Sequence, residues 1–429
     1  MKNILKFIIV FVLTLFARTV VRRYRPKIVM VTGSVGKTST KDAVAAVLAQ
    51  RFFVRKSEKS FNSEFGVPFT ILGVSNPWNN PFAWLSVMRN ALALMFLPNH
   101  YPNMLVLEVG ADKPGDLARI LHIATPDAVV VTLLPDIPVH VEAYACPDAV
   151  REEEFSPATA LAAAAPLIVP ADDPYALDRA LRMPAHVISY GTAEDASVCL
   201  QGIGFYEEEG MVTGMTASVR MGDEEGMCVV KGSVGRTQVL PVAAALAMAK
   251  AFHIPLGEAL TALEWYEPPP GRGRLFTGKN DSIIIDDSYN ASPVAVEEAL
   301  TTLKTFPRAN GAVKGRRIAI LGDMLELGRY SVMEHERISA LADDSADVVV
   351  AVGIRARVFA AVPKHAEVLL FDNAHAAALA LVEYVRPGDV ILVKGSQSIR
   401  TERIVKALLA NPEDVVRLVR QEKKWKQKV

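Results

Sequence analysis

The sequence has few cysteines, no surplus of either charge, and no apolar run long enough to cross a bilayer. Its three cysteines, Cys146, Cys199 and Cys228, are scattered and lack metal-ligand spacing. This excludes a disulfide framework and a zinc site, and it predicts reduced thiols in the cytoplasm. The 47 basic and 47 acidic residues cancel. Proteins that grip nucleic acid usually show a basic surplus, so we expect no nucleic-acid partner.

The longest apolar run lies near the N-terminus, where residues 7–17 read FIIVFVLTLFA. Lys2 and Lys6 precede it, and five basic residues follow it between positions 18 and 27. The run is well short of the roughly 20 residues that a membrane-spanning helix needs. Three interpretations of residues 1–26 remain open: a helix docked on the next domain, a shallow anchor at the membrane interface, or a short signal anchor.

The rest of the sequence predicts an α/β fold. At 429 residues, 51% of them hydrophobic, the chain is long enough for two or three domains. Val/Ile/Leu runs alternate with helical patterns, which is typical of parallel sheets covered on both faces. The expected strands are 27–31, 104–107, 128–132 and 167–169, and then 282–286, 317–321, 347–352, 367–371 and 389–393. The expected helices include 40–50, 158–165 and 239–252, and residues 186–235 predict a small β excursion.

A Pro-rich segment at 267–271 (EPPPG) is the strongest linker signal. It predicts three parts: an apolar N-terminal helix (1–26), a central α/β domain (27–268) and a C-terminal Rossmann-like α/β domain (269–429). The C-terminal part has no phosphate-binding loop of its own.

A phosphate-binding loop is predicted at 32–39 (TGSVGKTS), between an expected strand and an expected helix. Glycines let the backbone turn tightly and direct N–H groups at phosphate oxygens. Lys37 would reach the outer phosphates of ATP, and the Thr38 hydroxyl would ligate Mg²⁺. The spacing is shorter than GxxxxGK[ST], which excludes most kinases and GTPases. The predicted ATP-binding residues of the loop are Gly33, Ser34, Gly36, Lys37, Thr38 and Ser39.

TGSVGKTS resembles the compact nucleotide loop of the Mur ligases, and other segments follow in the order that this family has. They are SFNSEFGVP (60–68), LEVGA (107–111), PVH (138–140), ADDP (171–174), PGR (270–272), DDSYNASP (286–293), GDMLELG (322–328) and KGS (394–396). DDSYNASP and GDMLELG most resemble the branch that adds D-alanyl-D-alanine. The resemblance runs from about residue 27 to 409 and implies a central P-loop ATPase domain followed by a Rossmann-like domain.

The resemblance also implies a reaction. It is the ATP-dependent formation of an amide bond through an acyl phosphate, with release of ADP, which adds D-alanyl-D-alanine to a muramoyl-tripeptide cell-wall precursor. A Mur-like ligase with another acceptor, a non-catalytic nucleotide-binding regulator and a membrane-tethered NTPase switch remain alternatives. We expect a cytoplasmic monomer that uses ATP and Mg²⁺. Peripheral contact with the inner face of the membrane through residues 1–26 is one of the interpretations that stay open.

Several side chains are candidates for the site. Glu108 ends an expected strand, where a carboxylate suits a magnesium ion shared with phosphates. The resemblance implies that His140 helps to hold a second Mg²⁺, although a lone histidine is more often packed or solvated. Arg272, which follows the linker, would touch ATP when the domains close, unless it is a surface arginine in a salt bridge. Asp287 and Asn290 follow another strand and are candidates for nucleotide contacts.

These assignments give three sets. The predicted catalytic residues are Lys37, Glu108 and His140. The predicted metal ligands are Thr38, Glu108, His140 and Glu154. The predicted substrate-facing residues, several of which could be structural, are Asn62, Glu64, Asp323, Glu326, Lys394, Ser396 and Arg400.

The sequence departs from the family at three places. Where the family usually has a carbamylated lysine that binds metal, this chain has Glu154, which is shorter by roughly 4 Å; a solvated acidic helix face is the alternative reading. Thr237 and Pro241 replace a histidine and an adenine-contacting asparagine. The family's N-terminal uridine-nucleotide domain has no counterpart before residue 27, so the acceptor is expected to be bound differently or presented near the membrane.

Overall fold

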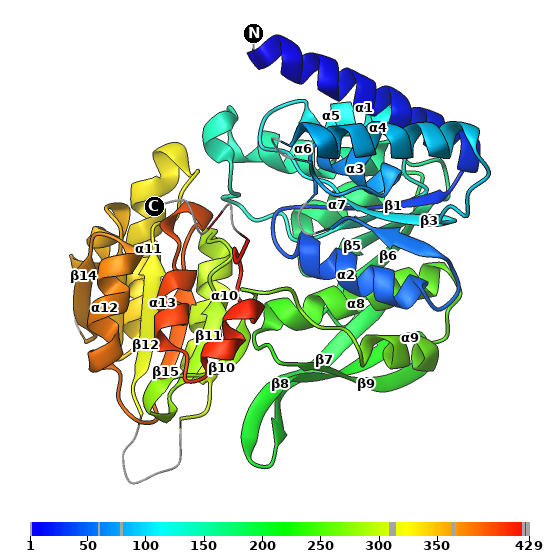
Figure 1. Cartoon of the computed structure of the whole chain (residues 1–429). Coiled ribbons are helices and arrows are strands. Elements are labelled where there is room, and N and C mark those ends of the chain that lie inside the picture. Colours follow the sequence, from blue (N-terminus) through cyan, green and yellow to red (C-terminus); the bar gives the residue numbers. More distant parts are fainter. Residues whose placement is uncertain are drawn as a thin grey trace.

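A computed structural model describes residues 2–58, 61–77, 80–308, 315–361, 365–422 and 425, with only the backbone for 2–5. Two α/β domains lie side by side, and the N-terminal helix lies along the central domain (Figure 1). The α/β fold with parallel sheets is therefore as predicted.

The central domain is built on a nine-stranded sheet of order β2-β3-β1-β4-β5-β6-β7-β8-β9. Strands β2 to β7 pair in parallel, and β7 to β9 are antiparallel. Its elements are α1 (Lys2–Tyr24), β1 (Lys27–Thr32), α2 (Lys37–Leu48), β2 (Val54–Lys56), α3 (Gly66–Leu72), α4 (Pro81–Phe96), β3 (Met104–Glu108), α5 (Asp116–Ile123), β4 (Ala128–Val131), η1 (Val141–Ala143), α6 (Pro147–Thr159), β5 (Pro166–Pro170), α7 (Pro174–Leu181), β6 (His186–Gly191), β7 (Val198–Glu208), β8 (Met211–Met221), β9 (Glu224–Lys231), α8 (Arg236–Ala251) and α9 (Leu256–Leu263).

The C-terminal domain has a six-stranded sheet of order β10-β11-β15-β12-β13-β14, parallel except for the edge strand β10. Its elements are β10 (Arg274–Thr277), η2 (Lys279–Asp281), β11 (Ile283–Asp287), α10 (Pro293–Thr305), β12 (Arg317–Gly322), η3 (Gly328–Tyr330), α11 (Ser331–Ser345), β13 (Val348–Val352), η4 (Arg355–Ala360), β14 (Glu367–Phe371), α12 (Ala374–Tyr384), β15 (Val390–Lys394), η5 (Gln397–Ile399), α13 (Glu402–Leu408) and η6 (Pro412–Arg417).

Two apolar layers cover the central sheet. Helices α2, α8 and α9 pack on one face, and α1 and α3 to α7 contribute to the layer on the other. Strand β1 is apolar on both faces because alternate residues serve each layer: Val29 and Val31 face α2, and Ile28 and Met30 face the opposite layer. Strand β1 therefore holds the phosphate loop rigidly at its carboxyl end.

The N-terminal segment folds as a 23-residue helix, α1, which packs against α3 and α4. Leu13, Ala17 and Val20 are buried in the interface. At its C-terminal end Arg23 donates to the carbonyls of Met95 and Leu97, the end of α4, where cations suit the helix dipole. No helix in the described part of the chain combines the length and apolarity that crossing a bilayer needs.

The predicted helix at 158–165 is wrong. Helix α6 ends at Thr159, and 160–165 form turns before β5. Two prolines account for the difference: Pro157 already lies in the last turn of α6, and Pro166 disfavours helical backbone at the residue before it. Residues 186–235, predicted as a β excursion, form β6 to β9 and extend the central sheet itself.

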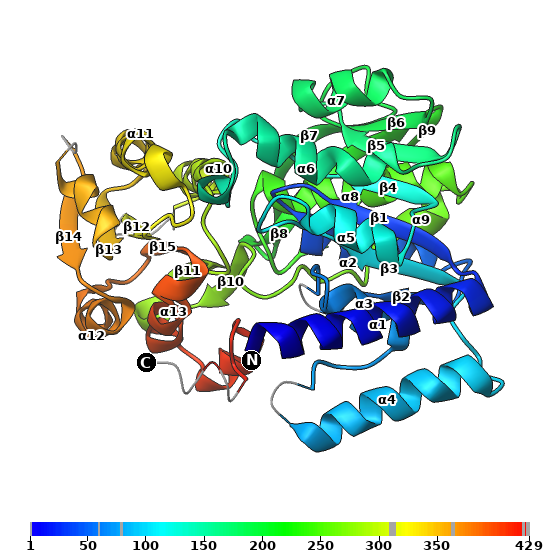
Figure 2. The same ribbon diagram turned by 90° about the horizontal axis from the view of Figure 1, so that it is seen from above.

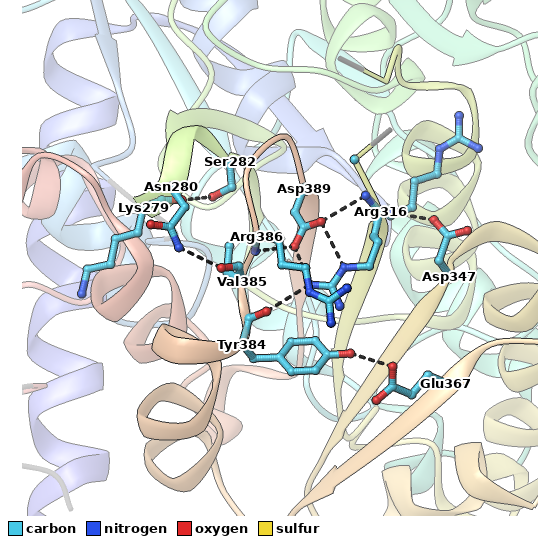
Figure 3. Close-up of polar contacts among 12 residues, drawn as sticks. Lys279, Asn280, Ser282, Arg316, Asp347, Glu367, Tyr384, Val385, Arg386 and Asp389 are labelled. Carbon is cyan, nitrogen blue, oxygen red and sulfur yellow. Dashed lines mark hydrogen bonds and ion pairs between the residues drawn. The ribbon is translucent and has the colours of Figure 1, made fainter. Parts of the chain in front are cut away.

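A buried ion pair lies at the end of the C-terminal sheet where the central strands β12 and β15 begin (Figure 3). Asp389, 1% exposed, accepts two hydrogen bonds from the Arg316 guanidinium, at 2.7 and 3.2 Å, and one from the Arg386 backbone N–H. The Arg316 guanidinium also stacks on Tyr384, 4.6 Å from the ring centre. These contacts fix the turn before β15, the strand that brings Lys394 to the site.

Candidate active site

A cavity of about 570 Å³ lies between the two domains, at the carboxyl ends of their parallel strands. This is where open α/β sheets bind ligands. The central domain contributes Ser34–Thr38, Asn62, Glu108, Asp112, Val139 and His140. The C-terminal side contributes Arg272, Tyr289, Asn290, Ser292, Ala295, Leu325, Glu326, Lys394, Ser396–Ser398, Arg400 and Trp425.

The phosphate loop is shaped by two glycines that have positive φ, 114° at Gly33 and 90° at Gly36. A Cβ on Gly33 would lie 2.4 Å from the Thr132 hydroxyl oxygen, so no other residue fits there. The backbone N–H of Ser34 donates to the Leu133 carbonyl at 3.0 Å, which holds the loop against the neighbouring strand end. Helix α2 begins at Lys37, and its free N–H groups face the cavity as an anion site.

Lys37 is the cation of this loop. Its ammonium donates to the Gly33 carbonyl and lies 3.7 Å from a carboxylate oxygen of Glu154, while the side chain keeps 15% exposure toward the cavity. The lysine is thus held by the loop itself, close to where the outer phosphates of a nucleotide would lie.

Glu108 and Thr38 form a candidate metal site. Their Oε1 and Oγ1 atoms are 3.2 Å apart, and Glu108 is 2% exposed. Its other oxygen, Oε2, has no hydrogen-bond partner among the residues that the structure describes and lies 3.9 Å from the Lys41 ammonium. Burial raises the pKa of Glu108, against the opposing charges of Lys41 and Lys37. A buried carboxylate with an unsatisfied oxygen beside a hydroxyl is a donor set that fits Mg²⁺.

His140 bridges the domains. Its Nδ1 lies 3.0 Å from Oε2 of Glu326, and its Nε2 lies 3.6 Å from Oδ1 of Asp112. Burial opposes a charge on His140, but the hydrogen bond and charge of Glu326 outweigh it and raise the pKa of the imidazole. The same contact lowers the pKa of Glu326. Both residues have positive φ, so the turns on either side are shaped to bring them together.

Glu154 lies beneath the phosphate loop. It is 2% exposed, and its Oε2 accepts hydrogen bonds from the Gly33 backbone N–H at 3.2 Å and the Thr32 hydroxyl at 3.1 Å. It is therefore no solvated helix face, which was the alternative interpretation of this acidic run. Across the described ranges, no group of three or more His, Cys, Asp or Glu side chains is arranged to hold a metal.

On the C-terminal side, Lys394 is 3% exposed and pairs with Asp287 at 2.5 Å, and it donates to the Asn290 carbonyl at 3.1 Å. Arg272 stacks on Tyr289, with its guanidinium carbon 4.2 Å from the ring centre. A stacked arginine and tyrosine make a flat, cationic wall suited to a nucleotide.

Most predicted site residues line this one cavity. The exceptions that matter are Glu64 and Asp323. Glu64 pairs with Lys6 of α1 at 2.9 Å and lines a neighbouring cavity. Asp323 is buried and accepts from the backbone N–H of Ala356 at 2.8 Å, so it supports the loop after β12. Gly33, Ser39, Asp287 and Glu154 are also predicted site residues that do not line the cavity.

Some lining or supporting residues were missed from the sequence. Lys41 is buried one helical turn after Lys37 and faces Glu108, a spacing of four that could have been noticed. Tyr289 lies within DDSYNASP, but nothing in that segment predicts its stacking with Arg272. Trp425 comes from the far C-terminal end and approaches Arg400, for which no sequence signal exists. Thr237 and Pro241 do not line the cavity.

This chain is similar to known protein families and to solved structures. The Mur ligase middle domain matches residues 31–249, and the Mur ligase glutamate ligase domain matches 271–397. The UDP-N-acetylmuramoyl-tripeptide–D-alanyl-D-alanine ligase of Mycobacterium leprae is 30% identical over 397 residues, covering 87% of this chain and 71% of the relative. The enzyme of that name from Bacillus subtilis is 27% identical, covering 92% and 79%.

Solved structures share the fold. The MurF ligase from Thermotoga maritima, in complex with ADP, has a TM-score of 0.75 and 24% identity, covering 95% of this chain and 84% of that one. Folylpolyglutamate synthase from Mycobacterium tuberculosis, also with ADP, has a TM-score of 0.61 at 16% identity. Both Mur ligase domains match this chain, in the order in which they occur, and the cavity lies between them. The chain therefore belongs to the Mur ligase family.

Proposed function

We propose that this protein is an ATP-dependent, ADP-forming ligase that joins the amine of D-alanyl-D-alanine to the free carboxylate of a muramoyl-tripeptide cell-wall precursor. One observation carries the proposal: a phosphate loop, a buried carboxylate and a second domain's cations meet in one interdomain cavity. The relatives bear the name of the enzyme with these two substrates. The Thermotoga relative, solved with ADP, supports nucleotide use.

The chemistry has two steps. The γ-phosphoryl group of ATP moves to an oxygen of the acceptor carboxylate, breaking its bond to ADP and giving an acyl phosphate. The amine then attacks the acyl carbon, loses a proton and expels phosphate. In the first step the protein mainly positions the groups and neutralises charge. The N–H groups at the start of α2 and Lys37 would hold the phosphates, while Arg272 and Tyr289 face the nucleotide from the second domain.

Mg²⁺, held by Thr38 and Glu108, would neutralise phosphate charge when bound. Two protein donors suffice, because magnesium commonly takes its remaining ligands from phosphates and water. His140 and Glu154 are proposed to support a second cation. Glu154 would do so through the loop or a water molecule, since its Oε2 is engaged with Gly33 and Thr32.

The C-terminal domain would supply the acceptor side of the site. Lys394, Ser396 and Arg400 line the cavity opposite the phosphate loop and would contact the polar groups of the peptide. Lys394 is held by Asp287 and Arg400 by Glu402, which would fix the position of both side chains. Closure of the two domains would exclude water and protect the acyl phosphate from hydrolysis. We further propose that the enzyme works as a monomer in the cytoplasm, with α1 in peripheral contact with the membrane.

Phosphate release tests the proposal. Purified protein is given ATP and Mg²⁺ with the muramoyl-tripeptide and D-alanyl-D-alanine, singly and together. Release that requires both, with a product mass equal to one new amide, is the expected result. ATP binding with no release under any combination of these substrates would contradict it.

A further inference from the structure

Helices α1 and α4 both expose large apolar side chains on the outside of the central domain. They lie side by side in both views (Figures 1 and 2). On α1, Phe7 and Phe11 are 71% and 61% exposed, and on α4, Phe82 and Leu85 are 82% and 69% exposed. Each pair is separated by one helical turn and points away from the core. We call the exposed side of these two helices the α1–α4 face.

The charge of the α1–α4 face is of one sign. Neither helix contains a single Asp or Glu. Arg22 and Arg25 lie at the C-terminal end of α1 and Arg89 lies within α4, and all three are exposed. Lys6, toward the other end of α1, is exposed but paired with Glu64 at 2.9 Å. Large apolar side chains flanked by cations are the composition of helices that lie in the headgroup region of a membrane. Anionic lipid headgroups complement this charge, which a second copy of the same basic face does not.

The N-terminal part of α1 also borders a cavity beside the active site. A second cavity, of about 680 Å³, is bounded by Lys6, Phe7 and Val10 of α1. It shares Asn62 and Asp112 with the cavity between the domains. Helix α1 begins on the side of the C-terminal domain and runs away from it (Figure 2). Phe7 therefore belongs both to the exposed face and to the wall of the cavity that adjoins the site.

We infer that the α1–α4 face lies on an anionic membrane surface and that the acceptor is a lipid-linked muramoyl-peptide, whose head group reaches the site past Phe7 and Val10. The acceptor part of this inference rests on the proposed function; the membrane part does not. The lipid end of such an acceptor would extend from the catalytic cavity toward the membrane. Helix α1 would then serve both in membrane docking and in delivery of the acceptor.

Vesicle co-sedimentation tests the docking. The full-length protein is mixed with vesicles of phosphatidylglycerol and phosphatidylcholine, or of phosphatidylcholine alone. Binding is expected to be stronger to the anionic vesicles and to weaken when salt rises from about 0.1 to about 0.5 M, because salt screens the charges. The double variant Phe11→Glu/Leu85→Glu should bind at least about tenfold more weakly.

The matched control is Met227→Glu/Trp265→Glu. These side chains are also exposed, by 59% and 87%, but lie on β9 and after α9, away from the α1–α4 face. The control should bind vesicles like the wild type. Failure of the wild type to bind anionic vesicles would overturn the inference. So would a wild-type dimer that the Phe11→Glu/Leu85→Glu variant converts to a monomer, since the face would then join two copies.

The acceptor is tested by comparing lipid-linked muramoyl-tripeptide in vesicles with the uridine-nucleotide-linked form. We expect kcat/KM to be at least about tenfold higher for the lipid-linked form, and Phe11→Glu/Leu85→Glu to lose that advantage while its ATP affinity stays unchanged. Equal use of the nucleotide-linked acceptor, indifferent to vesicles, would overturn the inference and leave the proposed function standing. No amide from either acceptor would overturn both.

Discussion

His140 of the central domain and Glu326 of the C-terminal domain both line the cavity and meet at 3.0 Å. The contact is an ion pair only while the imidazole is protonated and the carboxylate ionised. The pKa of Glu326 is lowered and that of His140 is raised. The pair therefore persists to a higher pH than a free imidazole would allow, and it is lost as pH rises through the raised pKa of His140.

This relationship predicts a pH-dependent domain arrangement. Without nucleotide, the radius of gyration measured by small-angle X-ray scattering should increase between about pH 6.5 and pH 9, because His140 loses its proton above its ordinary pKa of about 6.5. Glu326→Gln should be open at the lower pH already and show no further change. A radius that is independent of pH in the wild type would show that the pair does not hold the domains.

Lys37→Ala should reduce turnover by roughly 10³-fold or more, because the variant loses the charge that faces the developing phosphoryl transition state. The measurement is steady-state ADP release. Lys56→Ala is the control: this lysine is 49% exposed, pairs with Asp42 at 2.7 Å and lies outside the cavity. It should retain nearly full activity. A Lys37→Ala enzyme with normal turnover would place the phosphate site elsewhere.

Glu154 provides a carboxylate without carbon dioxide, so bicarbonate should not stimulate the wild-type enzyme. Glu154→Gln keeps a hydrogen-bond acceptor for the Gly33 N–H but removes the charge 3.7 Å from Lys37. We expect kcat to fall by about 10- to 100-fold with little change in fold, by analogy with other groups that orient metal-site and nucleotide ligands. Clear stimulation of the wild type by bicarbonate would mean that a lysine is carbamylated instead.

Asp389→Ala should cost about 3–5 kcal/mol in the free energy of unfolding, because it leaves the Arg316 guanidinium without its carboxylate (Figure 3). Asp372→Ala removes a pair of similar length, 2.5 Å to Arg357, but both partners are largely exposed. That change should stay within about 0.5 kcal/mol. Urea denaturation of the two variants makes the comparison, and equal effects would refute the assigned role of burial.

The sequence predicts the strands well, because both sheets are parallel and buried and their strands are continuous Val/Ile/Leu runs such as 128–131 and 348–352. The phosphate loop is equally predictable from the sequence, because Gly33, Gly36 and Lys37 are close neighbours along the chain. The helix predicted at 158–165 was wrong because the prediction relied on the high helix propensity of alanine. The flanking prolines determine the backbone of residues 160–165 instead.

Long-range relationships were beyond the sequence. Nothing near residue 140 indicates a partner at 326, because two separately folded domains bring them together. The docking of α1 on α3 and α4 depends on which side of the helix faces the core. Helix α1 is apolar on all sides, so its sequence does not indicate which side is buried. Glu154 reads as one of three consecutive acids, and only the fold shows that it alone is buried beneath the loop.

The most direct test of the central claim follows the oxygen atoms. An acceptor labelled with ¹⁸O in its reacting carboxylate is turned over with ATP and D-alanyl-D-alanine, and the released phosphate is analysed by mass spectrometry. Activation in this cavity through an acyl phosphate predicts one ¹⁸O atom transferred to phosphate for each amide formed. Amide formation with unlabelled phosphate would contradict it, because the carboxylate oxygen would then never have been bonded to phosphorus.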